Sequence, residues 1–382
     1  MSRNSLGLGV LGCGDAARNI YLPGIAGLEP SGAVHLAALC DQDEQRLRSA
    51  AAAYPGANTY CDFAEMLSDP GVEAVINVTP MQAHAECTLQ AIAAGKHVYS
   101  EKPIATALED ANRILEAARE KGVKVACAPV IMLHPEVRQA CRWVKNGALG
   151  KISMVRARGS HSGPAWVYNF TTDPTWFYKP GGGPLFDLGV YPIHVLCAML
   201  GPARRVTALA GISHPERVVR SGSARGKSIT VEIPDNIQMI IDFGDSTFAT
   251  LDATFTVLSA KGPRMEVYGD KGTLNLYSRP EEPPYELYID NPETGVRGWL
   301  EYEPSYRGSL MPFLGEQPDR NWSFAEGIRH LAECIEEDRE PVIGAELARH
   351  ILEIMEAALQ SAQTGCVVQI SSTFKTPDYW ED

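Results

Sequence analysis

The sequence predicts an α/β protein of two domains, in which a doubly wound parallel sheet is followed by antiparallel strands packed against helices. Short apolar strands alternate with helical patterns through the first third of the chain, which is typical of a parallel sheet with helices on both faces. The alternation stops near residue 128, and strands separated by turns dominate from about residue 205. With 382 residues, the chain is long enough for two hydrophobic cores. We therefore expect one domain over 1–128 and a second over 129–382.

The elements of the first domain follow from apolar runs and capping signals. Asp62 with Glu65, and Thr106 with Glu109, have the spacing of an N-cap and its capping-box partner, so each pair predicts the start of a helix. Gly122 predicts the end of the second of these helices. The apolar runs that predict buried strands cover residues 6–11, 34–40, 74–78, 97–99 and 124–126.

The second domain begins with helical patterns and continues as strands and turns. Strands joined by short glycine-containing turns indicate antiparallel pairing. The expected helices cover residues 135–146 and the stretch from about Leu185, and the expected strands cover residues 152–159, 237–243, 248–255 and 264–268.

The last hundred residues carry fewer signals. Residues 279–320 contain seven prolines and no clear period, which predicts a long ordered loop or insertion. The capping-box pair Ser323 and Glu326 then predicts a helix. A second helix is expected over 345–365, and a last strand over 366–370.

Composition and charge exclude several classes of partner. A formal net charge of −13 argues against binding to nucleic acid or to an anionic membrane. No run approaches the roughly 20 apolar residues that cross a bilayer. The start of the chain enters a strand at Leu6 and leaves no room for a secretory signal, so we expect a cytoplasmic protein. Nine cysteines without a CxxC pair or a metal-like spacing from histidine predict reduced thiols and no metal site.

A glycine motif directly follows the first strand and opens a helix. Small residues let the backbone approach a pyrophosphate, which rests on the unpaired N–H groups of the helix N-terminus. The alternative is a glycine turn that binds nothing, but the strand–turn–helix context favours a dinucleotide site. The motif consists of Gly12, Cys13, Gly14, Asp15, Ala16 and Ala17.

The second strand ends in an acidic stretch that begins at Asp41. A carboxylate there accepts hydrogen bonds from the adenosine ribose and repels a 2′-phosphate. Asp43 and Glu44 follow, and no arginine occurs before Arg46. The alternative is that Asp41 only caps the next helix. We expect NAD as the cofactor, with NADP disfavoured.

Two further loops follow strand ends, where ligands bind to a doubly wound sheet. One loop carries Asn77, Thr79 and Pro80, and the other contains Lys102 between a glutamate and a proline. A salt bridge within the second loop is the alternative explanation for this lysine. The residues expected to contact the cofactor from these loops are Asn77, Thr79, Pro80, His84, Glu101 and Lys102.

A third stretch, residues 181–194, combines three glycines with ionisable side chains. If it is helical from Leu185, then Asp187, Tyr191 and His194 stand at positions i, i+4 and i+7 on one face. A carboxylate, a phenol and an imidazole on one face are suited to proton transfer. A lone histidine, by contrast, is more often a core or surface residue.

Aromatic residues cluster shortly before this stretch. Aromatic faces suit the apolar side of a pyranose ring, so these residues are candidate walls of a substrate site. The alternative, that they form the core of the second domain, is equally open for each of them. The candidates are Trp166, Tyr168, Trp176, Phe177 and Tyr178.

The order of these motifs carries a family resemblance. Gly-x-Gly-x-x-Ala, Glu-Lys-Pro and Asp-x-x-x-Tyr together resemble the glucose-fructose oxidoreductase/inositol dehydrogenase (Gfo/Idh/MocA) family, and the likeness continues through 269–274 and 361–365. The resemblance implies a Rossmann domain followed by an α/β domain with an open, mostly antiparallel sheet. In this family that sheet often mediates oligomers, which implies a homodimer or homotetramer.

The resemblance also implies roles for single residues. Lys102 would lie near the nicotinamide and the reacting oxygen, and its bond to Pro103 would be cis. Asp187 would orient the substrate. Tyr191 falls at the acid/base position, where inositol dehydrogenase-like members carry a histidine. His194 falls where many members carry Asp or Asn, and we expect it to contact the substrate.

Together these expectations describe an oxidoreductase that transfers a hydride between a nicotinamide cofactor and a hydroxyl or keto carbon. The substrate would be a sugar, glycoside, inositol or related diol. Two other functions stay open. One is an NAD-dependent enzyme that cleaves or epimerises glycosides without net redox change, and the other is a cofactor-binding sensor or repressor.

Overall fold

The computed structural model describes residues 5–167, 171–277, 285–300 and 324–376, which form two compact units. The first unit takes in the chain up to Val130 and a later stretch that ends at Leu352. The second unit begins at Ile131 and includes the end of the chain from Glu353.

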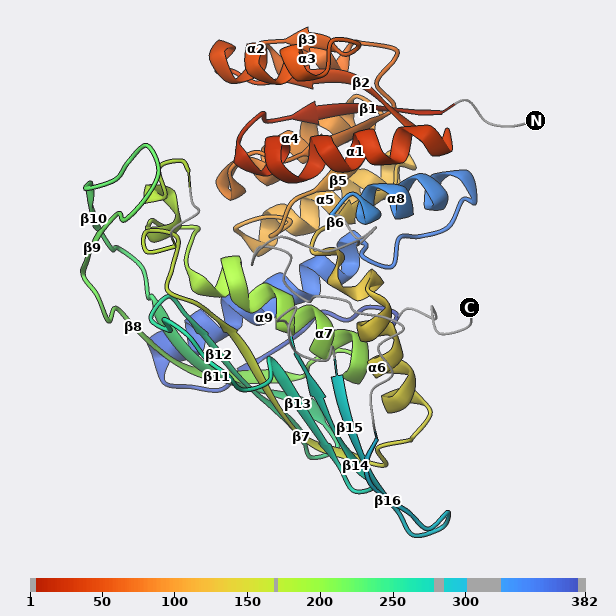
Figure 1. The fold of residues 1–382 in the computed structure, drawn as a ribbon, viewed down its shortest axis with the longest axis vertical. Helices are drawn as coiled ribbons and strands as arrows, with labels where there is room; N and C mark the ends of the chain where they lie inside the picture. The colour runs from red at the N-terminus through yellow and green to blue at the C-terminus, as the bar shows by residue number, and fades with distance from the viewer. Residues whose placement is uncertain (1–4, 168–170, 278–284, 301–323, 377–382) are drawn as a thin grey trace. The chain divides into compact units, whose positions relative to one another are not determined.

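The first unit is built on a six-stranded sheet in which every pairing is parallel (Figure 1). The strand order is β3-β2-β1-β4-β5-β6, so the direction of winding reverses between β1 and β4. In sheets of this kind, ligands bind beside the carboxyl ends of the strands at the reversal. This confirms the predicted doubly wound sheet. The strands are β1 (Leu6–Leu11), β2 (Val34–Cys40), β3 (Asn58–Tyr60), β4 (Ala74–Asn77), β5 (His97–Ser100) and β6 (Val125–Cys127).

The helices of this unit test the predicted caps. Asp62 is the N-cap of α3 (Phe63–Leu67), and its carboxylate accepts hydrogen bonds from the next turn, as expected. Gly122 ends α5 (Leu108–Lys121) in the left-handed conformation, as expected. The N-cap of α5 is Ala107, which has no side chain that can cap, so the predicted pairing of Thr106 with Glu109 is wrong. The other helices are α1 (Leu22–Leu28), α2 (Glu44–Ala53) and α4 (His84–Ala93).

One helix of the first unit comes from far along the chain. The helix α8 (Glu326–Glu336) packs on β5 and β6 (Figure 1). Gly327 allows this approach, because a Cβ there would lie 2.4 Å from the ring of Tyr99. The helix is present as predicted, but its N-cap is Ala325 and not Ser323, which lies outside the described residues.

The second unit is built on a nine-stranded sheet in the order β16-β15-β14-β13-β7-β12-β11-β8-β17 (Figure 1). Only the pairing of β7 with β12 is parallel, so the predicted mostly antiparallel sheet is confirmed. A separate two-stranded ribbon pairs β9 (Glu216–Val218) with β10 (Ser228–Thr230). The strands of the large sheet are β7 (Ile152–Ser160), β8 (Arg205–Gly211), β11 (Asn236–Gly244), β12 (Thr247–Thr254), β13 (Met265–Gly269), β14 (Gly272–Leu276), β15 (Tyr285–Asn291), β16 (Val296–Leu300) and β17 (Val368–Gln369).

One face of this sheet is buried and the other is exposed. Side chains along β11 and β12 alternate between buried and accessible, which is the period of a sheet with one solvated face. The helices α6 (Pro135–Lys145) and α7 (Val190–Leu200) belong to the buried side, together with the part of α9 (Ala345–Thr364) from Glu353 on. The hydroxyl of Ser361 on α9 accepts a hydrogen bond from the backbone of β8. The accessible face carries large apolar side chains, which include Met154, Leu209, Ile240 and Phe248.

The prediction for residues 279–320 was wrong in part. Two strands, β15 and β16, form a hairpin that extends the sheet, with a turn over residues 292–295. Pro292 falls in that turn, where no ladder hydrogen bond is lost. Residues 278–284 and 301–323 lie outside the described residues.

Candidate functional site

The glycine loop after β1 has the geometry of an anion site. Gly12 has φ 94°, and a Cβ there would lie 2.9 Å from the carbonyl oxygen of Val78, so only glycine fits. A Cβ on Gly14 would point into open space, which leaves room for a ligand against the backbone. The first backbone bond of the following helix runs from Arg18 N to Gly14 O, so the N-terminus of this helix lies at the glycine loop. This cradle suits a pyrophosphate.

Two π-helical turns occur at the predicted sites. One covers Ala17–Tyr21, directly after the glycine loop, and the other covers Leu185–Gly189, around Asp187. Such turns make up well under 1% of residues and are frequent at functional sites. The stretch from Leu185 was expected to be α-helical, so its first turn is a correction. The α-helix begins only at Val190.

Asp41 lies beside the glycine loop. One carboxylate oxygen accepts the amide of Cys13 at 2.7 Å, and the other accepts the amide of Asp43 at 2.8 Å. The N-cap of α2 is Asp43, whose side chain accepts from Gln45 and Arg46, so the alternative that Asp41 caps this helix is wrong. A carboxylate has about four acceptor positions, and two therefore remain for a ligand.

The loop after β4 is held from inside by Asn77. Its side chain is fully buried, donates to the carbonyl oxygen of His84 at 3.0 Å and accepts the hydroxyl of Thr79 at 2.7 Å. These bonds favour a role in shaping the loop. Thr79 is half-buried and Pro80 is exposed, so these two residues present the surface of the loop.

His84 joins this loop to the next one. Its Nδ1 lies 2.7 Å from the carbonyl oxygen of Pro103, and its Nε2 lies 2.9 Å from that of Thr79. Burial lowers the pKa of His84, and this effect outweighs the two carbonyl oxygens that favour the charged ring.

The Glu101-Lys102-Pro103 loop follows β5. The bond between Lys102 and Pro103 is cis, as the resemblance implied. One carboxylate oxygen of Glu101 accepts the hydroxyl of Tyr21 at 2.5 Å, and the other accepts the backbone amide of Lys102 at 2.9 Å. Lys102 itself is half-buried.

In the second unit, Asp187 stands out by its accessibility. From residue 182 to residue 199, Asp187 is the only residue that is not buried. The turn that carries it rests on β7 through two glycines, because a Cβ on Gly159 would lie 2.8 Å from the Cα of Gly189. Asp187 therefore has a partly accessible carboxylate on a turn that is closely packed against β7.

Tyr191 and His194 both lie on α7 and are buried. The Nδ1 of His194 lies 2.7 Å from the carbonyl oxygen of Val190, one turn earlier in the same helix. Burial lowers the pKa of His194 to about 4, so the ring is neutral at pH 7. This arrangement favours the core alternative for His194 over a role in proton transfer.

The predicted aromatic walls divide into two groups. Tyr178 is fully buried, and its hydroxyl accepts the amide of Ala165 at 2.9 Å, which is the environment of a core residue. Burial raises its pKa to about 12. Trp166 and Trp176 are half-buried, and Trp176 stacks on Phe177 with ring centroids 3.6 Å apart. Tyr168 lies outside the described residues.

Sequence reasoning missed a buried arginine beside these rings. Arg217 has no exposed side-chain surface, pairs with Asp235 at 2.8 Å, and lies 4.3 Å from the centroid of Trp166. The guanidinium of Arg220 also lies against Trp166, at 4.4 Å. An arginine in a short strand reads as a surface residue, so no local signal could have found this cluster.

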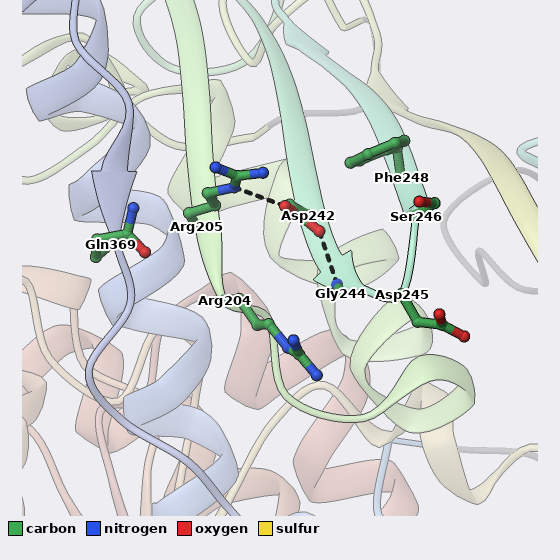
Figure 2. A pocket seen from close by; sticks show the side chains of 8 residues that line it. All are labelled: Arg204, Arg205, Asp242, Gly244, Asp245, Ser246, Phe248 and Gln369. Carbon is green, nitrogen blue, oxygen red and sulfur yellow. Dashed lines mark hydrogen bonds and ion pairs between the residues drawn. The ribbon is translucent and has the colours of Figure 1, made fainter.

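A pocket of about 360 Å³ lies at the ends of β8, β11 and β12 (Figure 2). None of the predicted site residues lines it. Arg205 pairs with Asp242 at 2.6 Å within it, and Figure 2 shows Arg204 directed away from this pair. Two arginines are balanced by Asp242 and Asp245, so the pocket has no net charge that would select a ligand.

Over the described ranges, no cluster of three or more His, Cys, Asp or Glu side chains is arranged to hold a metal ion. None of the helices in the described part of the chain is long and apolar enough to cross a membrane.

The fold and the glycine loop define a class of protein, one with a Rossmann-type domain suited to a dinucleotide. Residues 6–128 match the family described as "Oxidoreductase family, NAD-binding Rossmann fold", and residues 137–275 match "GFO/IDH/MocA C-terminal domain". The chain belongs to the Gfo/Idh/MocA family, as its motifs predicted.

Individual relatives are distant in sequence. The scyllo-inositol 2-dehydrogenase (NADP(+)) IolW of Bacillus subtilis (strain 168) is 25% identical over 326 residues, which cover 81% of this chain and 82% of that protein. The D-glucoside 3-dehydrogenase of Escherichia coli (strain K12) is 25% identical, covering 97% of this chain and 99% of that protein. The structure of levoglucosan dehydrogenase with NADH and levoglucosan has a TM-score of 0.80 at 20% identity, covering 96% and 99% of the two chains, which shows the shared fold.

Proposed function

We propose that this chain is an NAD-dependent oxidoreductase that acts on a hydroxyl or keto carbon of a sugar, glycoside, inositol or related diol. The observation that carries the proposal is the fixed position of Lys102. Its loop follows β5, at the same carboxyl edge of the sheet as the glycine loop, and Glu101 bonds to the helix that the glycine loop opens. The substrate class is supported by the relatives, which include inositol, glucoside and levoglucosan dehydrogenases.

In this proposal the first unit holds the cofactor and the second provides the substrate groups. The amides of the first helical turn bind the pyrophosphate, with Gly12 and Gly14 keeping the surface clear. Asp41 accepts the ribose hydroxyls. Residues 1–128 thus form the NAD-binding domain, with α8 packed on its sheet, and the remaining residues of 129–382 form the domain for substrate and oligomer contacts.

The chemistry needs a hydride acceptor and a proton acceptor. A bound nicotinamide would supply the hydride chemistry at the substrate carbon. Tyr191 exchanges the proton of the substrate hydroxyl, and the Lys102 ammonium stabilises charge on the same oxygen. Asp187 orients the substrate by accepting a hydrogen bond from a neighbouring hydroxyl. Trp166 and Trp176 offer their accessible edges to the sugar, while Tyr178 and His194 support the site from the core.

We also propose that the chain forms a homodimer or homotetramer through the open face of the nine-stranded sheet. Phe248 and Met154 are directly paired on neighbouring strands of that face, and they are 42% and 37% exposed. Contiguous apolar surface of this kind marks interaction sites, because covering it removes apolar area from water.

The test is activity with NAD and a panel of free sugars, glycosides and inositols. We expect absorbance from NADH with at least one of them, and loss of that activity in Lys102→Met with NADH binding retained. A Lys102→Met variant as active as the wild type would contradict the assignment. NADH that stays on the enzyme through turnover would indicate cleavage or epimerisation without net redox change. Cofactor binding without turnover of any substrate would favour a sensor.

A further inference from the structure

Tyr21 connects the helix that follows the glycine motif to the loop that carries Lys102. It ends the π-helical turn after the glycine motif, and its side chain is fully buried. Its hydroxyl donates to Glu101 at 2.5 Å, across eighty residues of sequence. The ring is held by Tyr99 and Phe324, with centroids 5.9 Å and 6.2 Å away.

Glu101 links Tyr21 to Lys102 by two hydrogen bonds, one to each carboxylate oxygen. The carboxylate oxygen that Tyr21 does not use accepts the Lys102 backbone amide at 2.9 Å. A carboxylate is rigid and planar, so fixing one oxygen also fixes the other. The position of the Lys102 backbone thus depends on the hydroxyl of Tyr21, which lies in the helix after the glycine motif.

The far side of the loop is held separately. The ring of His84 lies between the carbonyl oxygens of Pro103 and Thr79, at 2.7 Å and 2.9 Å. With His84 on one side and Tyr21 with Glu101 on the other, the Lys102 backbone has little freedom. Of these side chains, only Tyr21 belongs to the helix that the glycine motif opens.

The Tyr21 hydroxyl also satisfies one carboxylate oxygen of Glu101 as a hydrogen-bond donor. Burial and the neighbouring Glu101 raise the pKa of Tyr21 well above its usual value, so the hydroxyl stays a donor at every working pH. Without that donor, one oxygen of Glu101 would lose its partner in a partly buried place. This loss would loosen the carboxylate that holds the Lys102 backbone amide.

We propose that Tyr21 is a positioning residue that, through Glu101, sets the place of the Lys102 backbone, and thereby of its amine, relative to the helix that the glycine motif opens. The inference rests on the proposed function for its catalytic consequence, but not for the contact itself. Tyr21 does not touch substrate. It makes the geometry of Lys102 depend on the helix that binds the pyrophosphate.

The first experiment needs no substrate. Each lysine is labelled with a limiting amount of acetic anhydride, and the rate at Lys102 is compared with the rates at Lys124 and Lys151 by mass spectrometry. In Tyr21→Phe we expect the labelling rate of Lys102 to change by about threefold or more, because the backbone that carries the amine has lost one of its anchors and the surroundings of the amine change with it. The other two lysines should react as in the wild type. A merely structural role would lower stability without singling out Lys102.

The matched control is Tyr60→Phe. Tyr60 also donates its hydroxyl to a carboxylate, that of Asp69 at 2.9 Å, in the same unit. We expect this variant to have the labelling rate at Lys102 and the kcat of the wild type. A second variant, Glu101→Ala, should reproduce the slower turnover of Tyr21→Phe, and the double variant should be no worse than Glu101→Ala alone, because both changes break one connection. Additive losses would overturn the proposal.

Kinetics complete the test. Tyr21→Phe should lower kcat about 10- to 100-fold, since misplacing a catalytic group by about 1 Å costs up to 10². KM and NADH affinity should change less than about twofold. If Tyr21→Phe matches Tyr60→Phe in both labelling and kcat while Lys102→Met is inactive, the positioning role is wrong and the proposed function stands. If Lys102→Met is fully active, the proposed function fails, and the labelling result still decides whether Tyr21 controls the amine.

Discussion

The guanidinium of Arg217 and the carboxylate of Asp235 form an ion pair at 2.8 Å with essentially no exposed surface on either side chain. Arg217 also donates to the carbonyl oxygen of Ser162 at 3.0 Å, while Asp235 accepts the amide of Ser213 at 2.6 Å. The pair therefore joins the β9 ribbon to the segment that carries Trp166.

Breaking this pair should strongly destabilise the protein. Asp235→Asn leaves the Arg217 charge buried without its counter-ion, and such losses cost about 3–5 kcal/mol. Arg217→Met leaves the Asp235 charge in the same position. The double variant should lose less than the sum of the two single losses, as measured by urea unfolding. Fully additive losses would show that the two charges do not stabilise each other.

Stability should fall as the pH is lowered from 7 to 5 because of His194. Its pKa is about 4 in the folded protein, below its ordinary value of 6.5, so below pH 6.5 the unfolded chain takes up a proton that the folded chain does not. The loss should approach roughly 3 kcal/mol by pH 4 and be about 1 kcal/mol at pH 5.5. Urea unfolding of wild type and His194→Gln at pH 7.5 and 5.5 measures this difference.

The His194→Gln variant should show a shallower pH dependence than the wild type, whatever its stability at pH 7.5. Substitution of His35, which lies on the surface, is the control for the removal of an exposed histidine. Equal slopes for wild type and His194→Gln would contradict the assignment. Buried His84, whose pKa is also lowered, should account for part of the slope that remains.

Removing the Tyr191 hydroxyl should impair catalysis and spare cofactor binding. Tyr191→Phe keeps the ring that fills the buried position on α7, so the fold should be retained. General acid–base catalysis contributes about 10²–10⁴-fold, and kcat should fall by that factor. Fluorescence titration should give an NADH affinity close to that of the wild type. If Tyr191→Phe retains full activity and His194→Ala does not, the two roles are reversed.

The enzyme should prefer NAD to NADP. Asp41 is held beside the glycine loop by two backbone amides, and its charge would repel a 2′-phosphate. Arg46, the nearest arginine along the chain, lies 3.4 Å from the carboxylate of Asp43 and is thereby partly neutralised. The measurement is kcat/KM with each cofactor. Relatives are named for both NAD(+) and NADP(+), so family membership alone does not decide the preference. A higher kcat/KM with NADP would contradict this prediction.

A charge on the open sheet face should break the oligomer. Phe248→Asp places a carboxylate in the apolar surface that the proposed contact buries, at a cost of several kcal/mol per buried charge. Sedimentation velocity should show a dimer or tetramer for the wild type and a smaller species for the variant. Leu258→Asp is the control, because Leu258 is 72% exposed and lies outside the strands. A wild type that sediments as a monomer would contradict the proposal.

Local sequence determined most of the elements and the cofactor loop. Strands follow from short apolar runs, and a cap such as Asp62 depends on amides two or three residues away. Gly12 was predicted because its neighbours along the chain are a strand and a helix, and the close carbonyl of Val78 shows why glycine is required there. These signals act over a few residues, so a sequence contains them in full.

Tertiary structure decided which of the polar side chains are accessible. Sequence spacing grouped Asp187, Tyr191 and His194, but burial and a bond to Val190 separate His194 from the accessible Asp187. The bond from Tyr21 to Glu101, the return of α8 to the first unit and the pairing of Arg217 with Asp235 likewise join residues far apart in the chain. Such contacts depend on how whole elements pack, because burial and long-range pairing are properties of the folded core and not of any short segment.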